Sequence, residues 1–229
     1  KKCGHMGGKV LCSTREHIIR INAARMQADI MGVPLFIIAR TDAVDAKYID
    51  TDIDQRDHKH IKGLCDDGEL RTLPDEIIRQ LKLQNYKPKN RYSLREHHDS
   101  ILDMVAINNF NTFLNTENGR SFDEMKEFGK KYVNNELFWD HNNIKARSSE
   151  GFYSVKGSDE FAIERAVNFG KYSDSIWIET STPSLEQATK HAECIGKYLP
   201  NLPLSYNNSP SFNWDSKNTN MSDDDILNW

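Results

Sequence analysis

The chain has 229 residues, of which 38% are hydrophobic and 28% charged, and its formal net charge is −4. It has no apolar run near the ~20 residues that cross a bilayer and no basic excess, so neither a membrane protein nor a nucleic-acid-binding protein is indicated. The cysteines, Cys3, Cys12, Cys65 and Cys194, form no CxxC pair, which argues against a disulfide framework or a zinc site and favours a reducing compartment.

The N-terminal region of the chain predicts a helix followed by a buried strand. Ser13 and Glu16 match the capping-box pattern, and apolar residues then recur at helical spacing until Gly32, so we expect a helix over 14–31. The run 35–39 is apolar on both faces, which is typical of a strand covered by helices on one side and a core on the other.

The C-terminal region predicts two more strands, at 175–178 and 203–206, and helices at 158–169 and 184–198. This alternation of strands and helices is typical of a parallel α/β fold. Polar residues follow each strand, as they do on the active-site face of a (β/α)8 barrel. A doubly wound sheet is the alternative that the pattern leaves open.

The connection between the first strand and the next helix is much longer than the ~2 to 6 residues of an ordinary connection. It is polar and contains helical patterns at 75–84, 93–106 and 121–134. We therefore expect an insertion that is mainly helical. The predicted division has a first barrel segment over residues 1–62, a helical insertion over 63–137 and a second barrel segment over 138–229.

The hexapeptide KKCGHM at 1–6 holds the best candidate for a reactive group. Lys1, Lys2 and His5 would stabilise the thiolate of Cys3, which suits a group that transfers a proton or attacks a carbon atom. A lone cysteine near a histidine is more often a small buried apolar residue. The residues alone leave both interpretations open.

Four motifs occur in the order in which the isocitrate lyase family has them, and the chain resembles that family. They are KKCGHMGGKVL at 1–11, IARTDA at 38–43, WIET at 177–180 and YNNSPSFNW at 206–214. IDQRDH at 53–58 is similar to the eukaryotic members, which carry a helical insertion at this place. The chain departs from the family at Cys12 and Ser13, where Val and Pro are expected.

The resemblance implies a partial TIM-like barrel, about strands 5 to 7, and Mg²⁺-dependent retro-aldol cleavage of isocitrate to glyoxylate and succinate in the glyoxylate cycle. Cys3 would be the general acid that protonates the carbanion after cleavage. The implied substrate-binding residues are Gly4, His5, Arg40, Glu179, Asn207, Ser209 and Ser211.

Two of these assignments have a structural alternative. Arg40 offers a permanently charged fork for a substrate carboxylate, which we favour, and its alternative is an ion pair with Asp42 or Glu179. The NxSxS pattern around Pro210 would hold the carboxylate of succinate, and its alternative is a capped turn.

The resemblance also sets expectations about cofactor, assembly and compartment. The Mg²⁺ ligands are expected before the KKCGHM motif, so no residue of this chain is predicted to bind the metal. The expected assembly is a homotetramer, and the compartment is cytoplasmic or peroxisomal (glyoxysomal), with a mitochondrial one also compatible. We expect the chain to be an internal fragment that is inactive and prone to aggregate by itself, because half a barrel exposes strand edges.

Three other functions are weighed against isocitrate cleavage. A 2-methylisocitrate lyase, which releases pyruvate and succinate, is the nearest, and Met6 and Thr180 favour isocitrate over it. A catalytically silent relic would keep the pattern without the chemistry. A thiol–metal binding module is weak because Cys3 and His5 have no second pair at ligand spacing.

Overall fold

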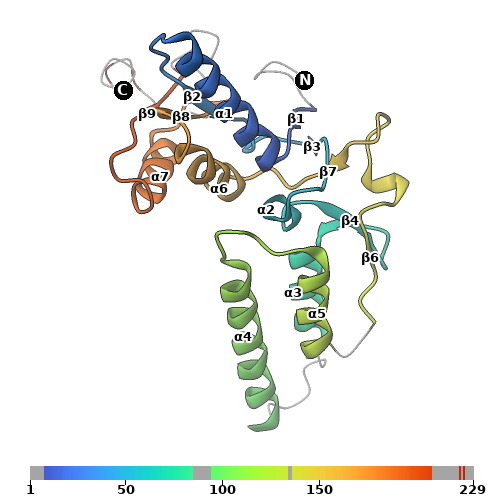
Figure 1. The fold of residues 1–229 in the computed structure, drawn as a ribbon. Helices are drawn as coiled ribbons and strands as arrows, with labels where there is room; N and C mark the ends of the chain where they lie inside the picture. The colour runs from blue at the N-terminus through green and yellow to red at the C-terminus, as the bar shows by residue number, and fades with distance from the viewer. Residues whose placement is uncertain (1–7, 85–93, 134–135, 208–221, 223, 225–229) are drawn as a thin grey trace. The chain divides into compact units, whose positions relative to one another are not determined.

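A computed structural model describes residues 8–84, 94–133, 136–207, 222 and 224. The chain forms two compact units, and the boundaries between them fall between Lys47 and Tyr48 and between Lys156 and Gly157. The ribbon of both units is drawn in Figure 1. Each unit is described by itself below.

The first unit contains a small parallel sheet. Its strands are β2 (Ile38–Thr41), β8 (Ser175–Ile178) and β9 (Leu204–Ser205), in the order β2-β8-β9, and a further short strand, β1 (Val10–Leu11), precedes them in the chain. Both pairs of neighbours run parallel. The parallel α/β arrangement expected from the sequence is therefore confirmed for these three strands, which do not by themselves show a closed barrel.

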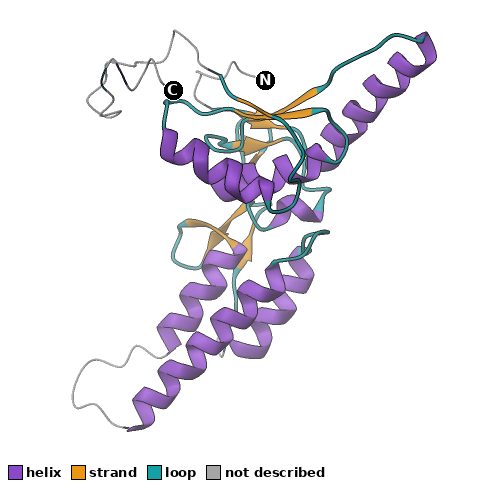
Figure 2. Ribbon diagram, turned by 90° about the vertical axis from the view of Figure 1, so that its left-hand side faces the viewer, coloured by secondary structure: helices purple, strands orange, loops and turns teal. Residues whose placement is uncertain are grey.

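Helices cover one face of this sheet. The helices of the unit are α1 (Thr14–Met31), α6 (Asp159–Gly170) and α7 (Leu185–Gly196). α6 lies against β2 and β8 and also contacts α1 and α7. Figures 1 and 2 show α6 and α7 on the same side of the strands. The sheet therefore has one face covered by helices. Arg40 and Trp177, which are paired across β2 and β8, lie on its other face.

Local capping signals explain why these helices begin where the sequence predicts. The Ser13 hydroxyl accepts a hydrogen bond from the Glu16 amide at 3.2 Å, and Gly32 ends α1 in the left-handed conformation. Ser158 and Ser184 cap α6 and α7 in the same way. All three helices are confirmed to within a few residues.

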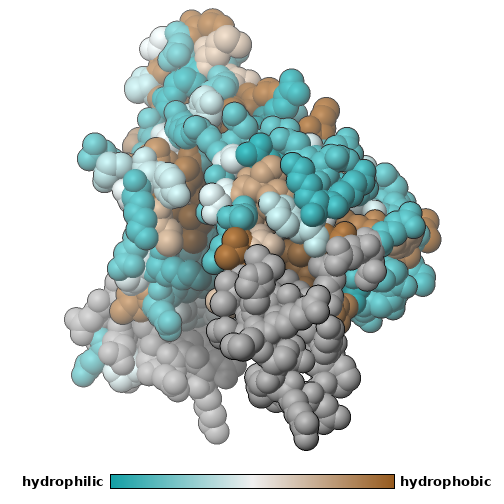
Figure 3. All heavy atoms as spheres, turned by 90° about the horizontal axis from the view of Figure 1, so that it is seen from below, coloured by the Kyte–Doolittle hydropathy of each residue, from teal (hydrophilic) through white to brown (hydrophobic). Residues whose placement is uncertain are grey.

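The position of the first strand was predicted wrongly. The apolar run 35–39 indicated a strand, but β2 begins at Ile38, and Leu35 and Phe36 lie before it with 43% and 65% of their surface exposed. The reason is that β2 is defined by its pairing with β8, a contact distant in the chain that an apolar run does not specify. Apolar residues, coloured brown, also reach the surface elsewhere in the view of Figure 3.

The second unit combines short strands with helices. In chain order its elements are β3 (Tyr48–Ile49), α2 (Gln55–His58), β4 (Lys62–Cys65), β5 (Leu70–Thr72), α3 (Leu73–Gln84), α4 (Leu94–Leu114), α5 (Phe122–Tyr132), β6 (Trp139–Asp140), the 3-10 helix Ile144–Ala146 and β7 (Tyr153–Ser154). β4 pairs antiparallel with β5 and β6, and β3 pairs antiparallel with β7.

The predicted insertion, 63–137, lies inside this second unit, which also takes in the segments on either side of it. The helices expected at 75–84, 93–106 and 121–134 correspond to α3, α4 and α5, and α4 continues to Leu114. The strands β4, β5 and β6 were not predicted. That the unit is inserted into a barrel stays a prediction.

A buried carboxylate joins α3 to the β4–β5 hairpin. Glu76 is fully buried and accepts hydrogen bonds from Arg79 Nε at 2.8 Å, Arg79 Nη2 at 2.7 Å and Gln80 Nε2 at 2.8 Å. Burial alone would raise the pKa of Glu76, but these donors outweigh it and hold the pKa below its usual value. Burial also raises the pKa of the neighbouring Cys65 thiol to about 11, so this cysteine stays protonated and is not a nucleophile.

A partly buried histidine of α1 packs against α6. The His17 ring packs against Phe169 with their centroids 4.4 Å apart. Burial, then the charges of Arg165 and Arg20, lowers the pKa of His17 from 6.5 to about 4. The folded unit therefore holds His17 in its neutral form at pH values where an unfolded chain would protonate it.

This shift predicts a pH-dependent loss of stability in the complete protein. Above pH 6.5 the contribution of His17 is fully present, and it is lost as the pH falls from 6.5 toward 4, because the unfolded state binds the proton first. We expect a loss of about 2 to 3 kcal/mol relative to His17→Gln. Hydrogen exchange of α1 at several pH values, corrected for intrinsic rates, measures it. A wild type and variant with parallel pH profiles would contradict it.

Candidate functional site

The parallel strands of the first unit bring their polar C-terminal ends to one edge of the sheet. The Glu179 amide donates to the carbonyl of Thr41 at 2.9 Å, so the pairing of β2 with β8 continues past the last strand residues. Asn207 follows β9 at the same end. Three of the predicted binding residues, Arg40, Glu179 and Asn207, therefore belong to the ends of neighbouring strands, where parallel α/β folds place their sites.

Arg40 is held by an acidic residue that directly follows its strand. Its Nε and Nη2 donate to the two oxygens of Asp42 at 2.8 and 2.9 Å, and Nη2 lies 3.5 Å from Glu179 Oε1. The guanidinium also lies over the Trp177 ring, 4.3 Å from its centroid. Both ion pairs named as the structural alternative for Arg40 are thus present, and its binding of a substrate carboxylate stays a prediction.

A second cation, Lys9, shares Asp42 with Arg40. Lys9 Nζ lies 3.4 Å from Asp42 Oδ1 and 3.7 Å from Asp45 Oδ2, and only 5% of its side chain is exposed. Its backbone carbonyl accepts from the Lys47 amide at 3.1 Å. The edge of the sheet therefore holds alternating charges in contact with one another.

Several buried polar atoms at this edge make no hydrogen bond among the described residues. These atoms are Lys9 Nζ, Thr41 Oγ1, Trp177 Nε1 and Glu179 Oε2. Glu179 as a whole is 1% exposed. Buried polar groups without partners are uncommon because each one costs about 1 to 3 kcal/mol. Their concentration at the strand ends is what a site that receives a polar ligand would have.

The other predicted site residues lie outside the described residues. They are the proposed acid Cys3, its neighbours Gly4 and His5, and the hydroxyl residues Ser209 and Ser211. Their roles stay predictions.

Lys9 and Asp45 were missed by the sequence interpretation, and Asp42 was named only as an alternative partner of Arg40. The available signal was a lysine directly before the apolar pair Val10 and Leu11, inside the same motif as Cys3. Only the fold shows which carboxylates it meets.

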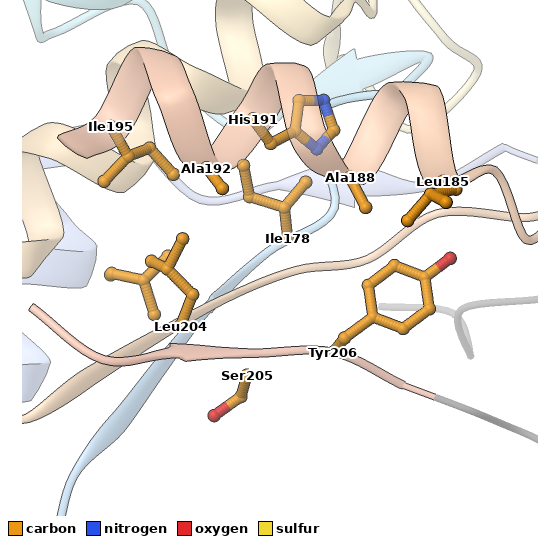
Figure 4. Close-up of a pocket in the computed structure, with 10 residues that line it drawn as sticks. Ile178, Leu185, Ala188, His191, Ala192, Ile195, Leu204, Ser205 and Tyr206 are labelled. Atoms are coloured by element: carbon orange, nitrogen blue, oxygen red, sulfur yellow. The ribbon is translucent and has the colours of Figure 1, made fainter. Parts of the chain in front are cut away.

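A separate cavity of about 260 Å³ lies between α7 and the strands β8 and β9. In Figure 4 the side chains of Ile178, Ala188 and Leu204 point into the space between helix and strand, whereas Ser205 points away from it. His191 borders this cavity, and its Nε2 lies 2.9 Å from Asp159. The lining is mostly apolar, so it does not match a ligand that carries several carboxylates.

No cluster of three or more His, Cys, Asp or Glu side chains that could hold a metal ion occurs within the described ranges. The carboxylates at the sheet edge, Asp42, Asp45 and Glu179, each lie against Lys9 or Arg40 instead. These residues do not fit a metal site.

Comparison with known proteins gives one consistent family. A sequence model described as "Isocitrate lyase family" matches residues 1–228. An isocitrate lyase of Pinus taeda is 37% identical over the whole chain, and one of Oryza sativa subsp. japonica is 33% identical over 99% of it; the chain spans 43% of the length of each. A mitochondrial 2-methylisocitrate lyase of Saccharomyces cerevisiae is 32% identical over 93% of the chain, which spans 40% of that protein.

The contact of Arg40 with the buried Glu179 predicts a measurable coupling in the complete protein. Arg40→Met should lower the free energy of opening β2 and β8 by about 1 to 3 kcal/mol, because it leaves a buried carboxylate without its cation. Adding Glu179→Gln should recover some of the loss, which hydrogen exchange of both strands would detect.

Arg20→Met is the matched control, since Arg20 and Glu16 form an exposed pair worth less than about 1 kcal/mol. Strictly additive effects of Arg40→Met and Glu179→Gln would show that the pair is not coupled.

Proposed function

The chain belongs to the isocitrate lyase family, and we propose that the complete protein cleaves isocitrate to glyoxylate and succinate. The observation that carries the proposal is the family match over residues 1–228, whose motif residues Arg40 and Glu179 lie in contact at the C-terminal edge of a parallel sheet. Because the chain spans less than half of its curated relatives, the activity is proposed for the complete protein.

In the proposed reaction a base removes the hydroxyl proton of isocitrate, and the carbon–carbon bond breaks as the new carbonyl of glyoxylate forms. The electron pair of that bond stays on the succinate portion as a carbanion, which its carboxylate stabilises. The thiol of Cys3 then donates its proton to this carbon and becomes a thiolate. The Lys1 and Lys2 cations near Cys3 in the sequence favour that thiolate.

Arg40 would bind a carboxylate of the glyoxylate portion. Asp42 takes the Nε side of the guanidinium, and Trp177 lies against its face, so the orientation of Arg40 is fixed before a ligand arrives. A preorganised, permanently charged donor stabilises an anion without the cost of reorientation.

The succinate portion would be held by Asn207, Ser209 and Ser211, whose amide and hydroxyl groups follow β9. Gly4 and His5 would contact the substrate from the segment that carries Cys3. Glu179, whose Oε2 is buried and accepts no hydrogen bond from the residues that the structure describes, is suited to accept one from the bound substrate.

We propose that the reaction requires Mg²⁺, which would neutralise substrate carboxylates and the developing alkoxide. The described residues do not fit a Mg²⁺ site, and the carboxylates at the sheet edge face cations. We place the metal ligands on residues of the complete protein outside this sequence.

Cleavage of 2-methylisocitrate is the second candidate, since proteins with that activity in their names are among the relatives. The two substrates differ by one methyl group, and such a difference in an apolar pocket is worth ~1 to 3 kcal/mol. One or two side chains therefore suffice to change the preference. We favour isocitrate because of Met6 in KKCGHM and Thr180 in WIET.

A partial (β/α)8 barrel, a homotetramer and a place in the glyoxylate cycle complete the proposal. No described helix combines the length and apolar character needed to cross a bilayer. The cytoplasmic, peroxisomal (glyoxysomal) and mitochondrial compartments stay open, and two relatives carry "mitochondrial" in their names.

An assay of the complete protein tests the function directly. With Mg²⁺ we expect release of glyoxylate from isocitrate and a smaller release of pyruvate from 2-methylisocitrate. In Cys3→Ser the rate of release of either product should fall by at least about a hundredfold, because a hydroxyl is a far weaker acid than a thiol. Cys194→Ser is the matched control and should keep full activity.

Dominant pyruvate release would move the assignment to 2-methylisocitrate lyase. Release of neither product by the folded wild type would favour the catalytically silent relic.

A further inference from the structure

A buried lysine at the sheet edge has no role in the reaction as described above. Lys9 is 4% exposed, and its ammonium group makes ion pairs with Asp42 and Asp45 but no hydrogen bond within the described part of the chain. Burying an ammonium group without hydrogen bonds is costly, and a leucine or methionine would pack in the same space without that cost. The charge itself therefore needs an explanation.

The charges around Lys9 supply that explanation. Asp42 makes ion pairs with both Lys9 and Arg40. Asp45 also pairs with Lys9, and Glu179 also pairs with Arg40. Counting the described residues of this cluster, three carboxylates face two cations, and their formal charges sum to one negative charge. If Lys9 were neutral, the formal charge of this group would be one unit more negative.

We propose that Lys9 is a positioning residue that shares Asp42 with Arg40 and so keeps Arg40 able to bind an anionic substrate. The inference rests on the proposed function, because it takes Arg40 as the group that binds a substrate carboxylate. Lys9 acts through Asp42 and does not touch the substrate.

The substrate competes for Arg40 with carboxylates of the protein itself. A carboxylate that arrives at Arg40 must compete with Asp42 and Glu179, and it is repelled by every uncompensated negative charge nearby. Lys9 neutralises Asp42 and Asp45 from the protein side. Because Lys9 and Glu179 are buried and their partners are partly buried, water and salt screen these interactions less than they would at a fully exposed surface.

The test is the kinetics of Lys9→Met in the complete protein with isocitrate. We expect KM to rise about tenfold to a hundredfold, because the variant leaves one uncompensated carboxylate charge several ångströms from the substrate. We expect kcat to change less than about threefold. The exposed Lys190, which pairs with Asp159, provides the matched control, and Lys190→Met should match the wild type.

A second substitution separates charge balance from packing. In Lys9→Met/Asp45→Asn the net charge of the cluster returns to its original value, so KM should return to within a few-fold of the wild type. A merely structural lysine would not be rescued in this way. An unchanged KM in Lys9→Met, or no recovery in the double variant, would overturn the proposal.

If Lys9→Met does not fold, the single variant Asp45→Asn tests the proposal. It removes a negative charge from the cluster and should lower KM or leave it unchanged. A raised KM would refute the role of Lys9. The dissociation constant of glyoxylate, whose carboxylate is the one proposed to bind Arg40, separates this inference from the proposed function when calorimetry measures it for each variant. A wild type that binds glyoxylate without turnover contradicts the proposed function only, and Lys9→Met should still weaken that binding. A wild type that turns over isocitrate with an unaffected Lys9→Met contradicts this inference only. A wild type that neither turns over isocitrate nor binds glyoxylate contradicts both.

Discussion

The candidate site depends on the parallel register of β2, β8 and β9. This register sets Arg40 opposite Trp177 and Trp177 opposite Ser205, so these three residues form one row across the sheet. Because side chains alternate between faces, a slip by one residue would turn Arg40 toward the helices α6 and α7. The contact of Arg40 with Glu179 and with the Trp177 ring exists only in the observed register.

The pairing of Arg40 with Asp42 and its proposed binding of a substrate carboxylate are compatible. Arg40 has five N–H donors, and Asp42 accepts from two nitrogens on one side of the guanidinium. An arginine without such a partner would sample many rotamers and lose that freedom when a ligand binds. The structural alternative is thus better understood as the means by which the cation is oriented.

The sequence was most informative where the controlling signal is local. Ser13, Ser158 and Ser184 cap helices that begin where the sequence predicts, because the capping hydrogen bond joins residues three apart. β2 was misplaced because its bounds depend on pairing with a strand far along the chain. The β4–β5 hairpin had a local signal that was overlooked, namely Asp67 followed by Gly68 with positive φ. The motifs identified Arg40 and Glu179, but the partners of Lys9 come from tertiary structure alone.

The two units differ in how their buried charges are satisfied, and this difference supports the proposed site. In the second unit the carboxylate of Glu76 is satisfied by Arg79 and Gln80, as expected of a group whose role is to hold α3 in place. In the first unit Glu179 Oε2 and Thr41 Oγ1 are buried at the strand ends without a hydrogen bond among the described residues. A fold gains nothing from such atoms, whereas a binding site does, because a ligand that supplies the missing donors and acceptors is favoured over one that cannot. The proposal therefore places ligand binding at the C-terminal ends of the parallel strands rather than in the second unit.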